Sequence, residues 1–174
     1  LDPAVDELGK RVRKRTLMNR ELCLELFIDR VNNLNKYASS LGIKLMIENN
    51  VISSNNFKTF SCDPFLMTTL NEAQYIMKNT DSNVSLLVDV AHLKVSSVSH
   101  KKSSKLFLDS LDPYITGYHL SDNNGLSDSN DAYNNESWFW PFLKKDLDYY
   151  SIEVYTDNAI IQKEMVDLLK RNLF

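Results

Sequence analysis

The segment Val84-Ser85-Leu86-Leu87-Val88-Asp89 is a short apolar run that closes on a carboxylate, and it is the clearest indication of the fold. Continuous apolar runs of this kind are typical of parallel strands, which are covered on both faces. Three more segments repeat the pattern of an apolar run that ends on or beside an ionisable residue. They are residues 43–48, 115–119 and 150–155. The sequence therefore predicts four buried parallel strands.

Helical patterns precede and separate the four predicted strands. Residues 20–41 carry apolar side chains at helical spacing, and Gly42 predicts where that helix ends. Asp63-Pro64 predicts the start of a second helix. Further helices are expected near residues 103–111, near 138–145, and from Asp157 or Asn158 onward, with a polar loop directly after residues 84–89. This alternation predicts an α/β fold with right-handed crossovers, in which one helix is followed by four strand–helix units.

The length and composition are those of an ordinary globular chain. Its 174 residues can bury a core, and 43% are hydrophobic while 25% are charged. We expect a single domain over residues 1–174, with residues 1–19 as a loop or extension. The net charge of −3 gives no sign of nucleic-acid binding. The one basic cluster, Lys10 to Arg15, is expected to be a solvated loop or helix start rather than a phosphate site.

The cysteines and the hydropathy indicate the compartment. Cys23 and Cys62 have neither a disulfide framework nor a metal-binding spacing, so both are expected to be free thiols in a reducing compartment. No apolar run approaches the roughly 18 residues that are needed to span a bilayer. We therefore expect a cytoplasmic protein without a membrane partner.

Four ionisable residues lie at the C-terminal ends of the four predicted strands: Glu48, Asp89, His119 and Glu153. The C-terminal ends of parallel strands meet on one rim, where α/β proteins carry out their chemistry. Any one of these residues alone is explained by a satisfied polar side chain inside a barrel. Crowded carboxylates, however, repel one another unless a cation neutralises them. Three carboxylates and an imidazole suit Mn²⁺, Mg²⁺ or Co²⁺, and Zn²⁺ is also possible.

Four segments around these residues resemble the xylose-isomerase-like superfamily: Leu45 to Asn49, Val88 to His92, Gly117 to Asp122 and Ile152 to Tyr155. That superfamily includes sugar-phosphate isomerases and epimerases, ketose 3-epimerases, inosose dehydratases and the endonuclease IV type of DNA-repair enzyme. The resemblance covers roughly residues 20–174 and implies a TIM-type (β/α) barrel. The chain would supply the last four strand–helix units of eight, as the C-terminal half. It would then need the missing N-terminal half barrel or an oligomeric partner.

The resemblance also implies roles for individual residues. Glu48, Asp89, His119 and Glu153 match the metal ligands of the epimerase branch. Glu48 and Glu153 match the paired glutamates that transfer a proton next to the metal-bound carbonyl of a sugar, sugar phosphate or cyclitol. His92 matches the family's Asp-x-x-His, which implies contact with substrate oxygens or with a second metal. Its alternative is a histidine at a helix start that bonds to the backbone.

The loop after His119 separates the branches of the superfamily. Many members carry Asp-x-His in this loop, but here the positions read Asp128-Ser129-Asn130. Asparagine is a poor zinc ligand, which disfavours a divergent endonuclease IV-like nuclease. Asp122 and Asp128 are expected either to contact substrate hydroxyls or to cap the loop. A metal-dependent isomerase or epimerase is the expected function, and a non-catalytic barrel module is the other alternative.

Overall fold

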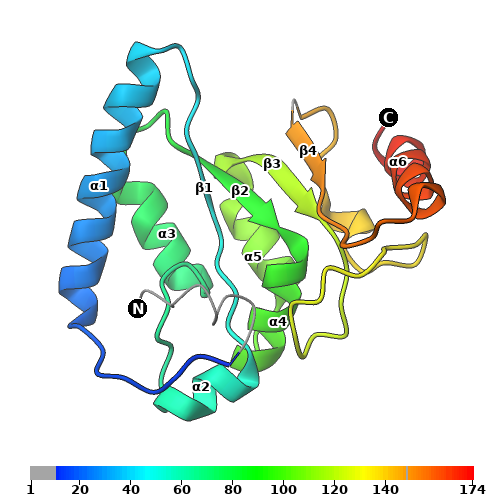
Figure 1. The fold of residues 1–174 in the computed structure, drawn as a ribbon. Coiled ribbons are helices and arrows are strands. Elements are labelled where there is room, and N and C mark those ends of the chain that lie inside the picture. Colours follow the sequence, from blue (N-terminus) through cyan, green and yellow to red (C-terminus); the bar gives the residue numbers. More distant parts are fainter. Residues whose placement is uncertain (1–10, 148) are drawn as a thin grey trace.

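The structure is a computed structural model, and it describes residues 11–147 and 149–174. At its centre lies one four-stranded sheet with the strand order β1-β2-β3-β4. The strands β1 (Met46–Glu48), β2 (Ser85–Asp89), β3 (Ile115–Leu120) and β4 (Tyr149–Ile152) run parallel to one another. All four expected strands are thus present. The chain adds each strand to the same side of the previous one, as Figure 1 shows.

Six α-helices accompany the sheet in the described residues. They are α1 (Arg20–Ser40), α2 (Ser54–Phe60), α3 (Leu70–Asn79), α4 (Val90–His100), α5 (Ser104–Leu111) and α6 (Ala159–Leu173), with 3-10 turns at Asp112–Tyr114 and Trp140–Phe142. Side-chain caps explain several of the starts, because an oxygen at the cap position accepts a backbone N–H of the first turn. Asn19 caps α1, Ser103 caps α5 and Asn158 caps α6.

Three expectations about the helices are wrong. Asp63 does not start a helix, because its Oδ1 accepts from the Phe65 N–H in a turn and α3 begins at Leu70. Residues 138–145 form only a 3-10 turn, so no α-helix lies between β3 and β4 in the described residues. A helix, α4, stands where a polar loop was expected after β2. Its buried residues lie on several sides, which removes the single apolar stripe that marks a surface helix in a sequence.

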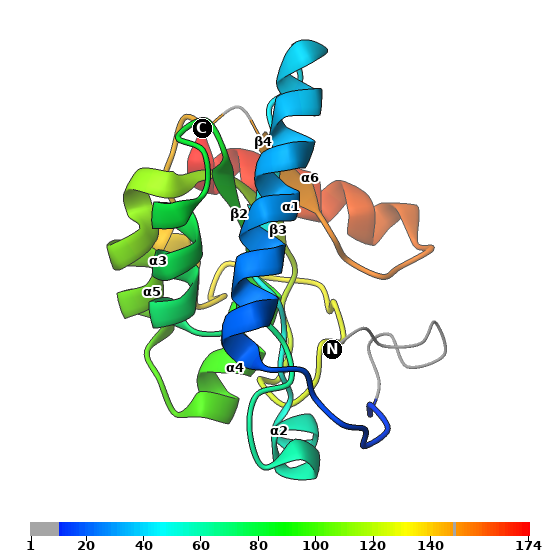
Figure 2. The ribbon, with the colours of Figure 1, turned by 90° about the vertical axis from the view of Figure 1, so that its left-hand side faces the viewer.

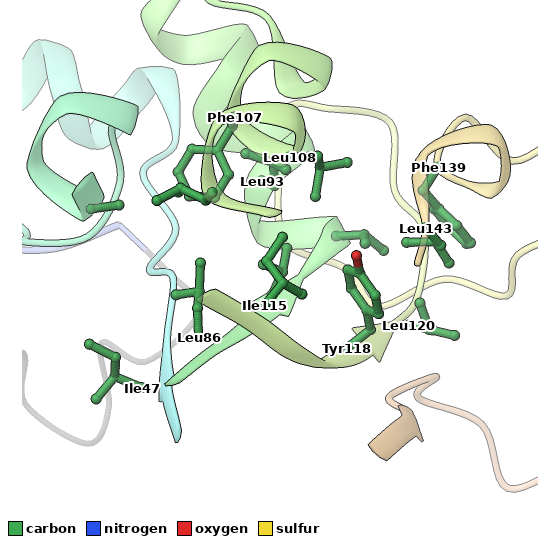
Figure 3. Close-up of a cluster of buried hydrophobic side chains, with 14 of the residues drawn as sticks. Ile47, Leu86, Leu93, Phe107, Leu108, Ile115, Tyr118, Leu120, Phe139 and Leu143 are labelled. Carbon is green, nitrogen blue, oxygen red and sulfur yellow. The ribbon is translucent and has the colours of Figure 1, made fainter. Parts of the chain in front are cut away.

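The main core lies between one face of the sheet and the helices. Figure 3 shows Leu93, Phe107 and Leu108 of the helices above Leu86, Ile115 and Tyr118 of the sheet. All six side chains are buried. Figure 2 shows α1 beside α3, with which it is in contact. These helices cover one face of the sheet.

The other face of the sheet carries the alternate residues, and Gly117 lies in the middle of it. A Cβ atom at Gly117 would stand 2.9 Å from Tyr149 Cδ1, 3.2 Å from Leu87 Cδ1 and 3.3 Å from Met46 Sδ. Glycine is therefore required here by close approach rather than by backbone conformation. The side chains of Tyr149, Leu87 and Met46 form an apolar layer on this face, beneath the C-terminal ends of the strands, which we call the floor.

A second, smaller cluster ties the segment before α1 to the rest. Val12 is buried with Ile52, Phe60 and Phe65, and its N–H donates to Asn56 Oδ1. Residues 11–19 form no helix or strand, and residues 11–15 are exposed apart from Val12. Residues 1–10 of the expected extension lie outside the described residues.

Neither thiol is in a disulfide, as expected, with Cys23 half-buried and Cys62 exposed. Among the described helices, none has the length and apolar character that crossing a membrane requires.

Candidate metal centre

The four expected ligand residues converge on one rim of the sheet. Glu48 ends β1, Asp89 ends β2, and the register pairs Asp89 with His119 of β3. Glu153 follows β4 and continues its ladder, because its N–H donates to the Leu120 carbonyl at 3.0 Å. One ligand atom from each of the four residues lies within 4.8 Å of the other three. Because the four parallel strands end at the same rim, the residues at their C-terminal ends come together there.

The cluster is closed on one side and open on the other. His119 Nδ1 stands 3.0 Å from Glu153 Oε2 and 3.5 Å from Glu48 Oε1. The side chain of Asp89 is 0% exposed, whereas Glu48 and Glu153 retain 35% and 33% exposure. Asp89 is thus closed off from solvent, whereas the two glutamates remain within reach of a molecule from solvent.

These residues fit a divalent ion. Within the described residues, Asp89 Oδ2, His119 Nδ1 and Glu153 Oε2 are buried and make no hydrogen bond, although the last two atoms form an ion pair. Buried acceptors without donors are costly, and carboxylates that face one another add repulsion. A cation between them would satisfy all of these groups at once. The donor set of oxygens and one imidazole nitrogen is that of a hard or borderline metal.

The electrostatics of the cluster point the same way. Burial raises the pKa of Asp89 to about 7, although the neighbouring His92 lowers it, and Glu153 and Asp128 add to the increase. The Glu48 carboxylate, 3.5 Å from Nδ1, raises the pKa of His119, against the effect of burial. Both groups therefore hold protons more tightly than in a free peptide when no cation is bound.

This proton affinity predicts that metal binding depends steeply on pH. Asp89, with a pKa of about 7, must lose its proton before its carboxylate can bind an ion, so affinity falls as the pH drops through 7. One displaced proton corresponds to about a tenfold loss of affinity per pH unit. We expect titration calorimetry with Mn²⁺ on both sides of pH 7 to show this, together with proton release. A flat profile would contradict the raised pKa of Asp89.

His92 lies in the first turn of α4 and contacts both sides of the cluster. Its Nδ1–H donates to the Asn49 carbonyl at 3.0 Å and lies 3.4 Å from Glu48 Oε1. Its Nε2 lies 3.2 Å from Asp128 Oδ2. Burial lowers the pKa of His92, but the hydrogen bond to Asp128 and the charges of Asp89 and Asp128 outweigh it and raise the pKa to about 10. His92 therefore bonds to the backbone, as its alternative description expected, and it borders the site. Its contact with substrate oxygens or a second metal stays a prediction.

Asn49 is a positioning residue that no sequence expectation singled out. Its buried side-chain amide accepts the Asp89 N–H at 2.8 Å and donates to the Asp89 carbonyl at 3.1 Å. The side-chain amide of Asn49 therefore extends the hydrogen bonding between β1 and β2 beyond Glu48, in place of backbone groups. It holds Glu48, its neighbour in the chain, beside Asp89. The only signal in the sequence is an amide residue directly after a rim glutamate.

The structure separates the two loop aspartates. Asp128 reaches the site through His92, and its Oδ1 is buried without a hydrogen bond among the described residues. Asp122 is occupied elsewhere: its Oδ1 accepts from Lys94 Nζ at 2.6 Å and from the Asn123 N–H at 2.8 Å, and its Oδ2 accepts from Ser137 Oγ at 2.8 Å. The loop-capping alternative therefore describes Asp122.

A cavity of about 250 Å³ lies beside the cluster. Glu48 and His92 line its polar side, and Phe27, Leu66 and Met67 line its apolar side.

Comparison with known proteins finds likeness in structure only. No protein-family model and no curated protein matches the sequence. Among solved structures, the probable 3-DHS dehydratase AsbF of Bacillus anthracis matches with a TM-score of 0.59 and 16% identity over 89% of this chain. The D-psicose 3-epimerase of Clostridium cellulolyticum H10, solved with D-tagatose, matches with a TM-score of 0.59 and 12% identity over 93%. The TTHB071 protein of Thermus thermophilus, from a soak with ZnCl2, matches with a TM-score of 0.57 and 18% identity over 91%.

All three are xylose-isomerase-like TIM barrels. The chain shares the fold of these three structures over about nine tenths of its length. The resemblance seen in the sequence is thus confirmed at the level of the fold. The chain spans only 59%, 56% and 59%, respectively, of those three solved chains.

Proposed function

We propose that this chain carries the metal-binding and proton-transfer residues of an isomerase or epimerase that acts on a sugar, a sugar phosphate or a cyclitol. The observation that supports this most is the convergence of Glu48, Asp89, His119 and Glu153 within 4.8 Å, with unsatisfied buried atoms on three of them. A structural neighbour described as a ketose 3-epimerase supports the same reaction class.

We further infer that the four strands are the C-terminal half of an eight-stranded barrel, within one domain over residues 1–174. The consecutive parallel order supports this, because a barrel adds its strands in sequence. Within the described residues, β1 and β4 each pair on one side only, which leaves an edge at both ends of the sheet. In each solved neighbour, two fifths or more of the chain has no counterpart here. We infer that a part of this kind closes the barrel, supplied by a preceding half barrel or by an oligomeric partner.

The proton-transfer chemistry rests on the two glutamates. Glu48 comes from β1 and Glu153 from the end of β4, with the two other strands between them, and both side chains are about one third exposed. One glutamate, ionised, removes the proton from the carbon beside the substrate carbonyl, and the other, protonated at the start, delivers its proton to the same or the neighbouring carbon. Delivery to the same carbon epimerises the substrate; delivery to the neighbouring carbon isomerises it, and the hydroxyl proton then passes to the former carbonyl oxygen. The two glutamates end with their protonation states exchanged, and proton exchange with solvent restores them.

Other residues hold the reacting groups in place. Glu48, Asp89, His119 and Glu153 would bind Mn²⁺, Mg²⁺ or Co²⁺, with Zn²⁺ as the alternative. When bound, such an ion polarises the carbonyl and so acidifies the adjacent C–H bond. Asp128 Oδ1, which lacks a donor among the described residues, is the acceptor that we assign to a substrate hydroxyl. His92, fixed between Asn49 and Asp128, borders the same space and is assigned to substrate oxygens.

Solvent exchange tests this function directly. The chain, together with whatever polypeptide completes the barrel, is loaded with Mn²⁺ and incubated in D2O with ketohexoses, ketose phosphates and a keto-inositol. We expect deuterium to enter one substrate at the carbon next to the carbonyl. The same protein with a chelator is the control and is expected to give no exchange. Metal binding without exchange into any of these compounds would exclude the proposed proton transfer.

A further inference from the structure

The loop after β3 is closed on itself by a two-residue bridge. The Asp122 N–H donates to the Asp131 carbonyl at 2.9 Å, and the Asp131 N–H donates to the Asp122 carbonyl at 2.8 Å. The enclosed residues, 122–131, form one unit that we call the rim loop. Because both ends are joined, a displacement at one point of the rim loop moves the rest.

Three contacts fasten the rim loop to helix α4. Lys94 Nζ lies 2.6 Å from Asp122 Oδ1 and also donates to the Asn123 carbonyl. The side chain of Asn123 donates to the Ala91 carbonyl at 3.0 Å. Gly125 lies so near α4 that a Cβ atom would stand 3.0 Å from Val98 Cγ2. The charged contact is shielded, since the side chains of Lys94 and Asp122 are only 28% and 17% exposed.

The other end of the rim loop reaches the candidate metal centre. Asp128 Oδ2 lies 3.2 Å from His92 Nε2, and His92 in turn lies 3.4 Å from Glu48 Oε1. The Asn130 carbonyl accepts the Tyr155 N–H at 3.0 Å, two residues beyond Glu153. The rim loop therefore connects α4 with the segment that carries Glu153.

We propose that Lys94 is a positioning residue for the metal centre, which acts through Asp122 to seat the rim loop and so to hold Asp128 against His92. The part of this proposal that concerns metal affinity rests on the proposed function. The part that concerns His92 does not, because the contacts exist without a bound ion. Asp122 belongs to the same set of contacts.

The negative charges around Lys94 explain why position 94 carries a lysine. The rim loop holds Asp122, Asp128 and Asp131, and it lies against a cluster that is itself rich in carboxylates. Without the ammonium group, the half-buried carboxylate of Asp122 would lose its only cation among the described residues and would repel the others. The loop would then lift from α4 rather than retain an uncompensated charge.

The test uses Lys94→Met, which removes the charge, and Lys94→Arg, which keeps it. Lys163→Met is the matched control, because Lys163 forms an exposed ion pair with Asp167 within α6, and neither is a residue of the rim loop. The first measurement is the NMR spectrum of the imidazole groups in metal-free protein, where His92 reports its contact with Asp128. The second is the affinity for Mn²⁺ by calorimetry.

We expect Lys94→Met to shift the His92 imidazole signals and to lower Mn²⁺ affinity about 10-fold, the usual cost of disturbing groups behind the ligands. Lys94→Arg should restore both, and Lys163→Met should change neither. Gly125→Ala, which places a methyl group 3.0 Å from Val98 and strains a backbone at φ +78°, disturbs the loop at a different point and should reproduce the His92 shift.

Unchanged His92 signals in Lys94→Met would overturn the proposal. Loss of the whole fold, measured by circular dichroism, would overturn it as well, because the ion pair would then hold the core and not the loop. If the unaltered protein binds no metal, the proposed function fails, while the His92 signals still decide the role of Lys94.

Discussion

Replacing Glu153 by glutamine is expected to weaken the binding of Mn²⁺ by more than about 100-fold. Changes to groups behind the ligands already cost about 10-fold to 100-fold, and Glu153→Gln removes the charge of a ligand itself. Its Oε2 is one of the three buried, unsatisfied atoms that face the cluster. Titration calorimetry measures the effect. Glu164→Gln, the same chemical change at an exposed position of α6, is the control and should bind as the unaltered protein does.

The stability of the same variant separates two descriptions of the cluster. If the four residues await a cation, Glu153→Gln relieves repulsion among carboxylates and should raise the free energy of unfolding of the metal-free protein. If they form a self-sufficient ion-pair network around His119, the variant should lower that free energy and leave metal binding unchanged. The second outcome would remove the basis of the proposed function.

Replacing Gly117 by valine is expected to destabilise the protein by about 2–3 kcal/mol, as overpacking does in close-packed interiors. The first added atom would already stand 2.9 Å from the ring of Tyr149 and 3.2 Å from Leu87. For a chain of this size the melting temperature should fall by about 4–12 °C, which thermal unfolding followed by circular dichroism will measure.

Two further variants identify the cause of that loss. Gly42→Ala is the contrasting control, because Gly42 has a φ of +71° but nothing within 4 Å of an added Cβ, so that its cost is backbone strain alone. Tyr149→Leu, combined with Gly117→Val, opens the space beside position 117 and should recover part of the stability that Gly117→Val alone loses. No recovery would mean that the floor is not the site of the strain.

The sequence predicts the strands and the rim residues well because one local signal determines both. In the segment that ends at Asp89, a continuous apolar run predicts a covered parallel strand, and the polar residue that closes it must then emerge at the rim. Repetition of that signal at Glu48, His119 and Glu153 predicts that they meet, which is the arrangement found. Their role as ligands stays a prediction.

The remainder of the site depends on contacts between segments far apart in the chain. Asn49 takes its role from backbone groups of Asp89, which no local pattern near Asn49 reveals. The sequence alone is equally compatible with a substrate contact at Asp122. Its contacts with Lys94 and Ser137 become apparent only in the structure. Helix α4 was missed because burial on several sides leaves no amphipathic period to detect.

One side chain serves both the fold and the candidate site. Asp89 Oδ1 accepts the His92 N–H at 2.8 Å and so caps the start of α4, while its Oδ2 is buried without a hydrogen bond among the described residues. One oxygen of the same carboxylate lies within 4.8 Å of the other three candidate ligands. The Asp89 carboxylate therefore both caps the start of α4 and belongs to the candidate ion-binding cluster. Thermodynamic linkage follows: whatever favours the ionised form of Asp89 also favours an ordered first turn of α4, and the reverse holds equally. Binding of an ion at the rim would therefore be coupled to the order of the first turn of α4.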